Sequence, residues 1–188
     1  MAYLTEDRVR SVLRSRGVQL AESELRKTAS ANENANFDVF LSHSYQDAQL
    51  IAGVKLILEN QRLSVFVDWI DDARLDRRAI TAKTAKHLQM RMRHCRSLIF
   101  ATSKTSVDSK WMPWELGYFD GIRPNHTAIF PLVKTPGMGF LGQEYLGICP
   151  HIEDIAAVGA TASLIVRSSA STTIPLGKFP LQGAPWRG

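Results

Sequence analysis

The sequence predicts a single α/β domain, in which a central parallel β-sheet is covered by helices on both faces. Three observations lead to this prediction. Short apolar runs alternate along the chain with segments whose apolar residues recur at helical spacing. The chain has 188 residues, 45% of them hydrophobic, which is enough for one buried core. No apolar run approaches the roughly 18 residues that a membrane-spanning helix needs.

The strands and helices of this domain follow from the same alternation. Four apolar runs predict the parallel strands, over residues 37–42, 63–68, 97–102 and 127–133. Helical spacing between them predicts helices over residues 46–60, 79–95 and 110–121. Connections between parallel strands are right-handed, so these helices are expected on both sides of the sheet. Beyond residue 133 the pattern weakens, and residues 145–149 and 162–167 are the candidates for further strands.

The two ends of the chain are predicted to lie outside the core domain, which covers residues 37–167. Residues 1–36 are polar and are predicted to form a helical amino-terminal extension and linker. Within this extension we expect a first helix, which is marked by one weak apolar stripe and ends at Gly17. We expect a second short helix over residues 21–29. Residues 168–188 are rich in Ser, Thr, Pro and Gly, and are expected to form a partly disordered carboxyl-terminal tail.

The composition indicates a cytoplasmic protein without a metal centre. The amino terminus reads Met-Ala-Tyr-Leu-Thr-Glu-Asp-Arg and has no apolar core of a secretory signal. Cys95 and Cys149 are too few and too far apart for a disulfide framework or a zinc site. His87 and His94 lie seven residues apart on a predicted helix, and the sequence shows no third ligand beside them.

The positive charge of the chain is local. Residues 70–96 hold eight Arg or Lys and three Asp, which accounts for the whole net charge of +5. Two interpretations stay open for this segment: a solvated helix face, or a surface for an anionic ligand or an acidic partner. Neither interleaved aromatic residues nor a nucleic-acid motif accompanies the charge, so nucleic acid is not a predicted partner.

One edge of the predicted sheet gathers the residues of chemical interest. Parallel sheets bind ligands beyond the carboxyl ends of their strands, which places residues 42–47, 68–78 and 103–115 together. His43, between two serines, lacks the flanking glycines of a nucleophile elbow, so a serine hydrolase is not predicted.

Glu115 lies in an apolar and aromatic segment, where a carboxylate costs desolvation energy unless it is paired or used. Trp111 is four residues earlier and shares its helix face, with Ser109 as the predicted N-cap. The local pattern fits either a core tryptophan beside a salt-bridged glutamate or an aromatic ring beside a functional carboxylate.

Four segments in order resemble TIR domains. They are Phe37-Asp-Val-Phe-Leu-Ser42 with its polar loop to Asp47, Val65-Phe-Val-Asp68, Cys95-Arg-Ser-Leu-Ile-Phe-Ala-Thr-Ser103, and Ser109-Lys-Trp111 with Glu115-Leu116. The last segment matches the family's Ser-x-Trp-x-x-x-Glu-Leu. They occur in this order within residues 37–133, about half of the chain. The resemblance implies the flavodoxin-like TIR fold, with a central parallel sheet and helices on both faces.

The resemblance also implies a function. Some TIR domains are adaptors that bind only each other, and others cleave the nicotinamide–ribose bond of NAD with the Glu of Trp-x-x-x-Glu. The short chain resembles the TIR proteins of bacterial Thoeris antiphage defence, which turn NAD into an ADP-ribose-derived signalling nucleotide. This implies a catalytic Glu115, NAD as substrate without a further cofactor, self-association through TIR contacts, and a separate effector that senses the product.

The alternatives are a non-enzymatic scaffold or mimic of host TIR domains, and a sensor that binds the nucleotide without turnover. Between hydrolase and cyclase the sequence leaves the choice open, since it does not specify the attacking nucleophile.

The resemblance to TIR domains also implies further site residues, which are assigned by their positions in the sequence. Trp111 is expected to stack on a ring of NAD, Arg74 to meet the pyrophosphate, and four more residues to bind the substrate from the strand ends: Ser42, Ser44, Asp47 and Asp68. Two departures from the family pattern concern this site. Residues 75–80 lack the glycine that usually precedes the next helix, and Pro113-Trp114 replaces the common Cys-containing form of the Glu motif.

Overall fold

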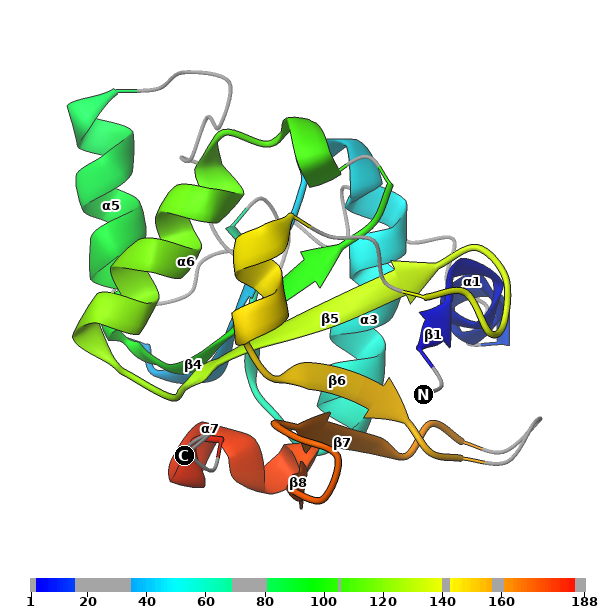
Figure 1. Ribbon diagram of the computed structural model, residues 1–188. Helices are drawn as coiled ribbons and strands as arrows, with labels where there is room; N and C mark the ends of the chain where they lie inside the picture. Colours follow the sequence, from blue (N-terminus) through cyan, green and yellow to red (C-terminus); the bar gives the residue numbers. More distant parts are fainter. Residues whose placement is uncertain are drawn as a thin grey trace.

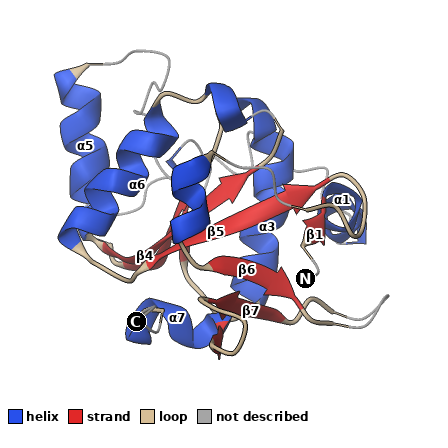
Figure 2. Cartoon of the chain, viewed as in Figure 1, coloured by secondary structure: helices blue, strands red, loops and turns tan. Residues whose placement is uncertain are grey.

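A computed structural model describes residues 3–15, 35–68, 81–104, 106–139, 143–156 and 161–184. In this part of the chain an eight-stranded sheet lies between two layers of helices (Figures 1 and 2). The strand order is β3-β2-β4-β5-β6-β7-β8, and β1 pairs with β5 outside this path. This arrangement confirms the predicted α/β fold.

Six strands of the sheet run parallel to one another. They are β1 (Leu4–Thr5), β2 (Phe37–Ser42), β3 (Val65–Phe66), β4 (Cys95–Thr102), β5 (Thr127–Val133) and β6 (His151–Asp154). β7 (Leu164–Arg167) and β8 (Thr173–Pro175) extend the sheet in antiparallel fashion. The four predicted parallel strands are confirmed, although the run at residues 63–68 forms only the two-residue β3.

Helices cover both faces, as predicted. One face carries α1 (Glu6–Ser15), α3 (Ala48–Asn60) and α7 (Phe179–Gln182), and the other carries α5 (Ala82–Arg93) and α6 (Trp111–Ile122). The strands alternate between the two cores, as the pleat requires. In β2, Val39 and Leu41 point into the first core and Phe40 into the second.

The interpretation of residues 145–149 as a strand is wrong. Residues Glu144–Ile148 form a short 3₁₀ helix, η3, in which Leu146 is buried and Ile148 is 76% exposed. A single buried side chain suffices to anchor this helix on the core, so the apolar run needs no strand. The fifth parallel strand along the central path is β6, whose sequence His-Ile-Glu-Asp is mostly polar. Three further 3₁₀ helices are η1 (Tyr45–Asp47), η2 (Ser106–Asp108) and η4 (Leu176–Lys178).

The amino-terminal segment completes the sheet and the core. Leu4 pairs with Leu132 of β5, and Val9 of α1 is fully buried against α3. The predicted helix before Gly17 is therefore confirmed as α1. The second helix predicted at residues 21–29 lies outside the described residues, as does nearly all of the linker at residues 29–36.

The carboxyl-terminal segment is also part of the fold. Residues 168–184, expected within a partly disordered tail, form β8, η4 and α7, and the side chains of Leu176 and Phe179 are fully buried. Apolar residues at wide spacing anchor the segment although Ser, Thr, Pro and Gly dominate its composition. Residues 185–188 lie outside the described part of the chain.

Cys95 is buried, Cys149 is half-buried, and the two do not form a disulfide bond with each other. Within the described ranges, no helix has the length and apolar character needed to cross a membrane. The same residues contain no group of three or more His, Cys, Asp or Glu arranged to hold a metal ion.

Candidate functional site

Glu115 and Ser42 meet at the carboxyl edge of the sheet. Ser42 is the last residue of β2, and Glu115 lies in α6, 73 residues later in the chain. The Ser42 hydroxyl donates a hydrogen bond of 2.6 Å to Glu115 Oε2, and both side chains are fully buried. Short hydroxyl–carboxylate bonds of this kind are among the stronger hydrogen bonds in proteins. The structure thus brings together two residues that the sequence placed on one edge.

The start of α6 fixes where Glu115 points. The helix begins at Trp111, with Lys110 rather than the predicted Ser109 as its N-cap residue. Ser109 still contributes, since its hydroxyl accepts the backbone N–H of Met112 at 3.4 Å. Four residues make just over one helical turn, so Trp111 and Glu115 face the same core.

Trp111 is mainly a packing residue at the margin of this site. Its side chain is 9% exposed and belongs to the core beneath α6. The ring meets Trp114 edge-on at a centroid distance of 5.4 Å, and Trp114 stacks on Tyr118 at 5.7 Å. The burial of Trp111 in this core helps to hold the first turn of α6, and with it Glu115, in place.

A second polar contact ties the loops after β2 and β4. Asp47, which follows β2, accepts a hydrogen bond of 2.6 Å from the Ser103 hydroxyl, just beyond β4. Ser44 is buried and caps η1 by accepting the backbone N–H of Gln46 at 3.4 Å. Ser44 and Asp47 therefore lie at the predicted edge, and both help to hold the loop conformation. Sequence reasoning missed Ser103 as the partner of Asp47, although Ser103 follows a predicted strand directly.

Asp68 lies at the same edge and faces a histidine. Its side chain is 1% exposed, and its Oδ1 is 3.6 Å from Nε2 of His43. The other ring nitrogen of His43, Nδ1, lies 2.9 Å from the backbone oxygen of Leu41. Sequence reasoning did not find His43 as a site residue, because its partner is distant in the chain. Arg74, the remaining predicted site residue, lies outside the described residues.

Comparison with known proteins identifies the family. No family model matches the chain. The chain is 46% identical over 131 residues to the probable 3' cyclic ADP-D-ribose synthase ThsB' of Bacillus cereus (strain MSX-D12), and the match covers 69% of this chain and 67% of that protein. The protein belongs to the ThsB-like TIR synthase family. A second relative, the putative cyclic ADP-D-ribose synthase TIR2 of Cytobacillus dafuensis, is 29% identical over 99 residues, which cover 50% of this chain and 26% of the relative.

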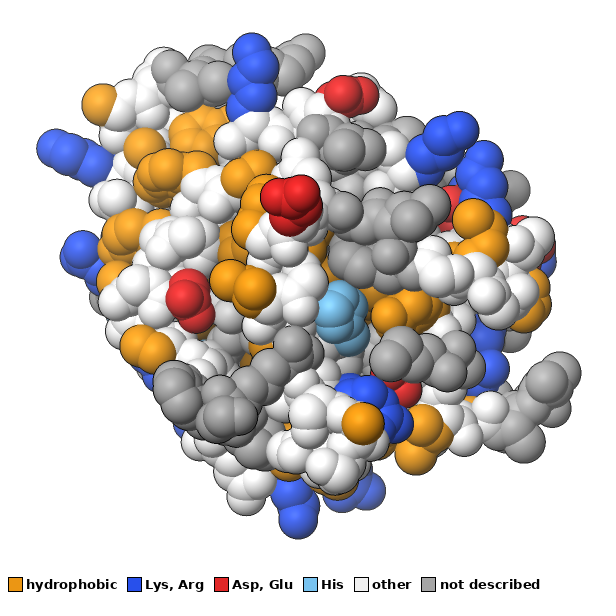
Figure 3. All heavy atoms as spheres, viewed as in Figure 1, with side chains coloured by type: hydrophobic (Ala, Val, Ile, Leu, Met, Phe, Trp, Pro, Cys, Tyr) orange, Lys and Arg blue, Asp and Glu red, His pale blue; other side chains and the backbone are white. Residues whose placement is uncertain are grey.

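The basic segment of this TIR synthase is not one solvated face. Three of its arginines contact other side chains: Arg91 lies 5.3 Å from the ring centre of Phe66, Arg93 donates to the Tyr118 hydroxyl at 2.9 Å, and Arg96 donates to Asp38 at 2.8 Å. Arg91 is fully buried. On the face seen in Figure 3, Lys and Arg side chains are spread mostly along the margin rather than gathered in one patch.

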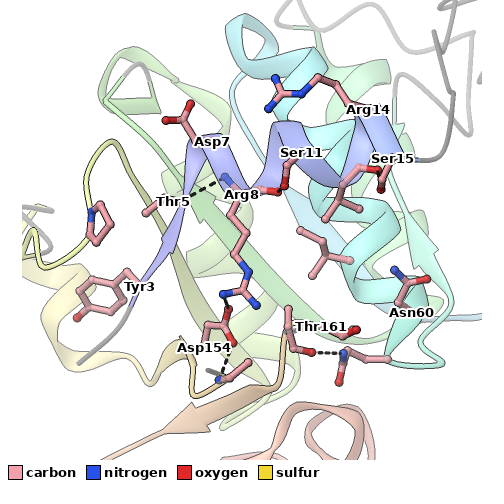
Figure 4. A pocket seen from close by; sticks show the side chains of 16 residues that line it. Tyr3, Thr5, Asp7, Arg8, Ser11, Arg14, Ser15, Asn60, Asp154 and Thr161 are labelled. Atoms are coloured by element: carbon pink, nitrogen blue, oxygen red, sulfur yellow. Dashed lines mark hydrogen bonds and ion pairs between the residues drawn. The ribbon is translucent and has the colours of Figure 1, made fainter. Parts of the chain in front are cut away.

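A hollow of about 770 Å³ in the TIR synthase lies apart from Glu115. It is bounded by β1, α1, the end of α3 and the β6–β7 turn (Figure 4). Arg8 reaches across it to Asp154, with 3.0 Å between Nη1 and Oδ2. Burial, followed by the negative charge of Glu153, raises the pKa of Tyr3 on the same wall. Two of the ionic groups at this hollow, Arg8 and Asp154, are thus paired with each other.

Proposed function

We propose that this protein converts NAD into a cyclic ADP-ribose and nicotinamide, and that the product acts as a signal in antiphage defence. The observation that carries the proposal is the buried Ser42–Glu115 hydrogen bond at the carboxyl edge of the sheet. Parallel α/β sheets bind their ligands at this edge. The family supports the same reaction, since both relatives are named as cyclic ADP-D-ribose synthases.

The reaction begins with cleavage of the bond between nicotinamide and ribose. The electron pair of this bond leaves with nicotinamide, and positive charge develops on the ribose as an oxocarbenium-like state. The carboxylate of Glu115, in a site that excludes water, stabilises that charge because a preorganised anion needs no solvent reorganisation. An oxygen or nitrogen nucleophile on the adenosine half then attacks the ribose carbon and loses a proton. The products are cyclic ADP-ribose, nicotinamide and H⁺.

The other predicted residues take supporting roles in this proposal. Ser42 holds the Glu115 carboxylate in one orientation, and Trp111 presents an aromatic edge where a ring of NAD enters. Ser44 and Asp47 line the loop beside the substrate, and Arg74 meets the pyrophosphate. Because Glu115 has no exposed surface in this structure, the residues that cover it must move aside before NAD reaches it. We therefore expect turnover to depend on assembly or on a trigger.

The experiment follows NAD turnover by the full chain. Purified protein is incubated with NAD over a range of protein concentrations, nicotinamide is measured by chromatography, and the other product is identified by mass spectrometry against cyclic and linear standards. We expect a cyclic product, with the 3' isomer named for the Bacillus cereus relative as the leading candidate. Glu115→Gln should lower the rate by about 100-fold or more. Glu144→Gln, which changes an exposed glutamate of η3, serves as the matched control and should leave the rate unchanged.

Each outcome is decisive for one part of the proposal. Equal rates for Glu115→Gln and the wild type would remove Glu115 from the mechanism. Linear ADP-ribose as the sole product would make the protein a hydrolase. No turnover even in dense assemblies would favour the non-enzymatic scaffold.

A further inference from the structure

The connections that follow β2 and β4 run to opposite faces of the sheet. β2 leads into α3, which packs on one face, and β4 leads into α6, which packs on the other (Figure 1). The two strands are neighbours, and Ser42 lies opposite Phe100 near their carboxyl ends. Neighbouring strands whose connections diverge in this way leave a crevice between their loops, and open α/β sheets bind ligands there. The buried pair of Ser42 and Glu115 lies at this point of the edge.

A short polar contact spans this crevice. Ser103, in the loop after β4, donates a hydrogen bond to Asp47, in the loop after β2, with 2.6 Å between Oγ and Oδ2. Hydroxyl–carboxylate bonds of this length are among the stronger hydrogen bonds in proteins. Both side chains are half-buried, whereas Ser42 and Glu115 have no exposed surface. The contact therefore joins the two loops nearer to solvent than the catalytic pair.

Each half of this contact is braced within its own loop. Asp47 ends η1, and its backbone N–H donates to the carbonyl oxygen of Ser44 at 3.0 Å. On the other side, the hydroxyl of buried Ser106 donates to the Ser103 carbonyl at 2.8 Å and accepts the Ser103 N–H at 3.2 Å. These bonds lie within one loop each, so separating Asp47 from Ser103 breaks none of them. The crevice can therefore open while both turns keep their shape.

We propose that the Asp47–Ser103 bond is a latch, which holds the crevice closed in the absence of NAD and opens as NAD binds. The ribose hydroxyls of NAD are donors of the same kind as the Ser103 hydroxyl. When NAD enters, a ribose hydroxyl replaces Ser103 as a donor to Asp47, so the carboxylate exchanges one hydrogen bond for another. A closed resting state agrees with the lack of exposed surface on Glu115. This inference rests on the proposed function, which supplies NAD as the ligand.

The latch sets the fraction of molecules that are open to NAD, and kinetics of the full chain test it. The apparent affinity for a ligand falls in proportion to the fraction of binding-competent molecules. Removing a hydrogen bond to a charged group shifts such an equilibrium by about tenfold, so we expect Ser103→Ala to lower KM for NAD by about that factor. The value of kcat should stay unchanged, because the latch is already open in the NAD complex. Ser103→Thr keeps the hydroxyl and should keep the KM of the wild type.

Ser64→Ala is the matched control. The Ser64 hydroxyl donates to the Asp38 carboxylate at 2.8 Å, near the amino end of β2. The substitution removes the same kind of bond from the opposite end of the strand, and should leave KM and kcat per folded molecule unchanged. A KM for Ser103→Ala that equals or exceeds that of the wild type would overturn the latch. A fall in KM that Ser103→Thr or Ser64→Ala shares would overturn it as well.

Amide hydrogen exchange tests the latch without turnover. In Ser103→Ala without NAD we expect faster exchange at Ser106 and also at Asp47, because loops that have lost the bond between them open locally more often. Ser103→Thr should exchange like the wild type. Faster exchange confined to the substituted loop, or no change in either loop, would refute the coupling between the loops. If the wild type does not turn over NAD, the proposed function fails, whereas this measurement still decides whether the bond holds the two loops together.

Discussion

Gly53 allows α1 to dock on α3, and its replacement by alanine tests how the amino-terminal segment joins the domain. A Cβ atom at Gly53 would lie 2.5 Å from Val9 Cγ1, 3.0 Å from the Val9 backbone oxygen and 3.2 Å from Leu13 Cγ. Val9 is fully buried, and a valine in a helix has one strongly preferred rotamer. The added methyl group therefore has to displace α1 itself.

The expected loss follows from two opposing contributions. Alanine is favoured over glycine within a helix by about 1 kcal/mol. Overpacking a filled core costs about 1–3 kcal/mol. Because the added methyl group would also meet a backbone oxygen, we expect the cost at Gly53 to lie toward the upper end of this range. The difference predicts that Gly53→Ala lowers the free energy of unfolding by about 1–2 kcal/mol. For a chain of this length, that corresponds to a melting temperature lower by roughly 2–8 °C.

The assay is thermal and urea unfolding, together with amide hydrogen exchange of α1. Gly117→Ala on α6 is the matched control, because a Cβ there meets nothing within 4 Å. It should raise stability by up to about 1 kcal/mol through helix propensity. In Gly53→Ala we expect faster exchange over residues 6–15. A variant as stable as the wild type, with α1 still protected, would refute the packing argument.

Two further predictions concern residues at opposite ends of β2. Ser42→Ala should lower kcat for NAD by about 10- to 100-fold, because Glu115 loses the donor that orients it; a wild-type kcat would show that Glu115 needs no such support. At the other end of β2, burial raises the pKa of Asp38, but the hydrogen bonds from Ser64 and Arg96 together lower it by a larger amount. The pKa of Asp38 therefore lies below its ordinary value of 3.8. Asp38 therefore stabilises the fold above pH 3.8, and this contribution is lost as the pH falls through the folded-state pKa. Asp38→Asn should cost about 1 kcal/mol or less at neutral pH, since Arg96 is half exposed, and the difference in melting temperature from the wild type should shrink in acid; a difference that is constant with pH would contradict this account.

The apolar runs and helical stripes determined most of the fold. Burial alone produces these patterns, so β2, β4, β5, α3 and α6 were predictable from spacing. β6 was not predictable in this way. Its Glu153 and Asp154 are buried because Arg167 and Arg8, both remote in the chain, neutralise them. The run of residues 145–149 resembled a strand more than β6 did, and only the tertiary structure distinguished the two segments.

The same division applies to the site. The sequence by itself determined that a carboxylate, Glu115, sits in an apolar helix at the edge where such sheets bind ligands. Only the tertiary structure showed that Ser42 is the hydrogen-bond partner of Glu115 and that His43 faces Asp68. Local patterns report which side of an element is buried, because burial repeats with the period of the element. The partner of a buried polar group depends on how separate strands end beside one another, and that is fixed by packing across the whole domain.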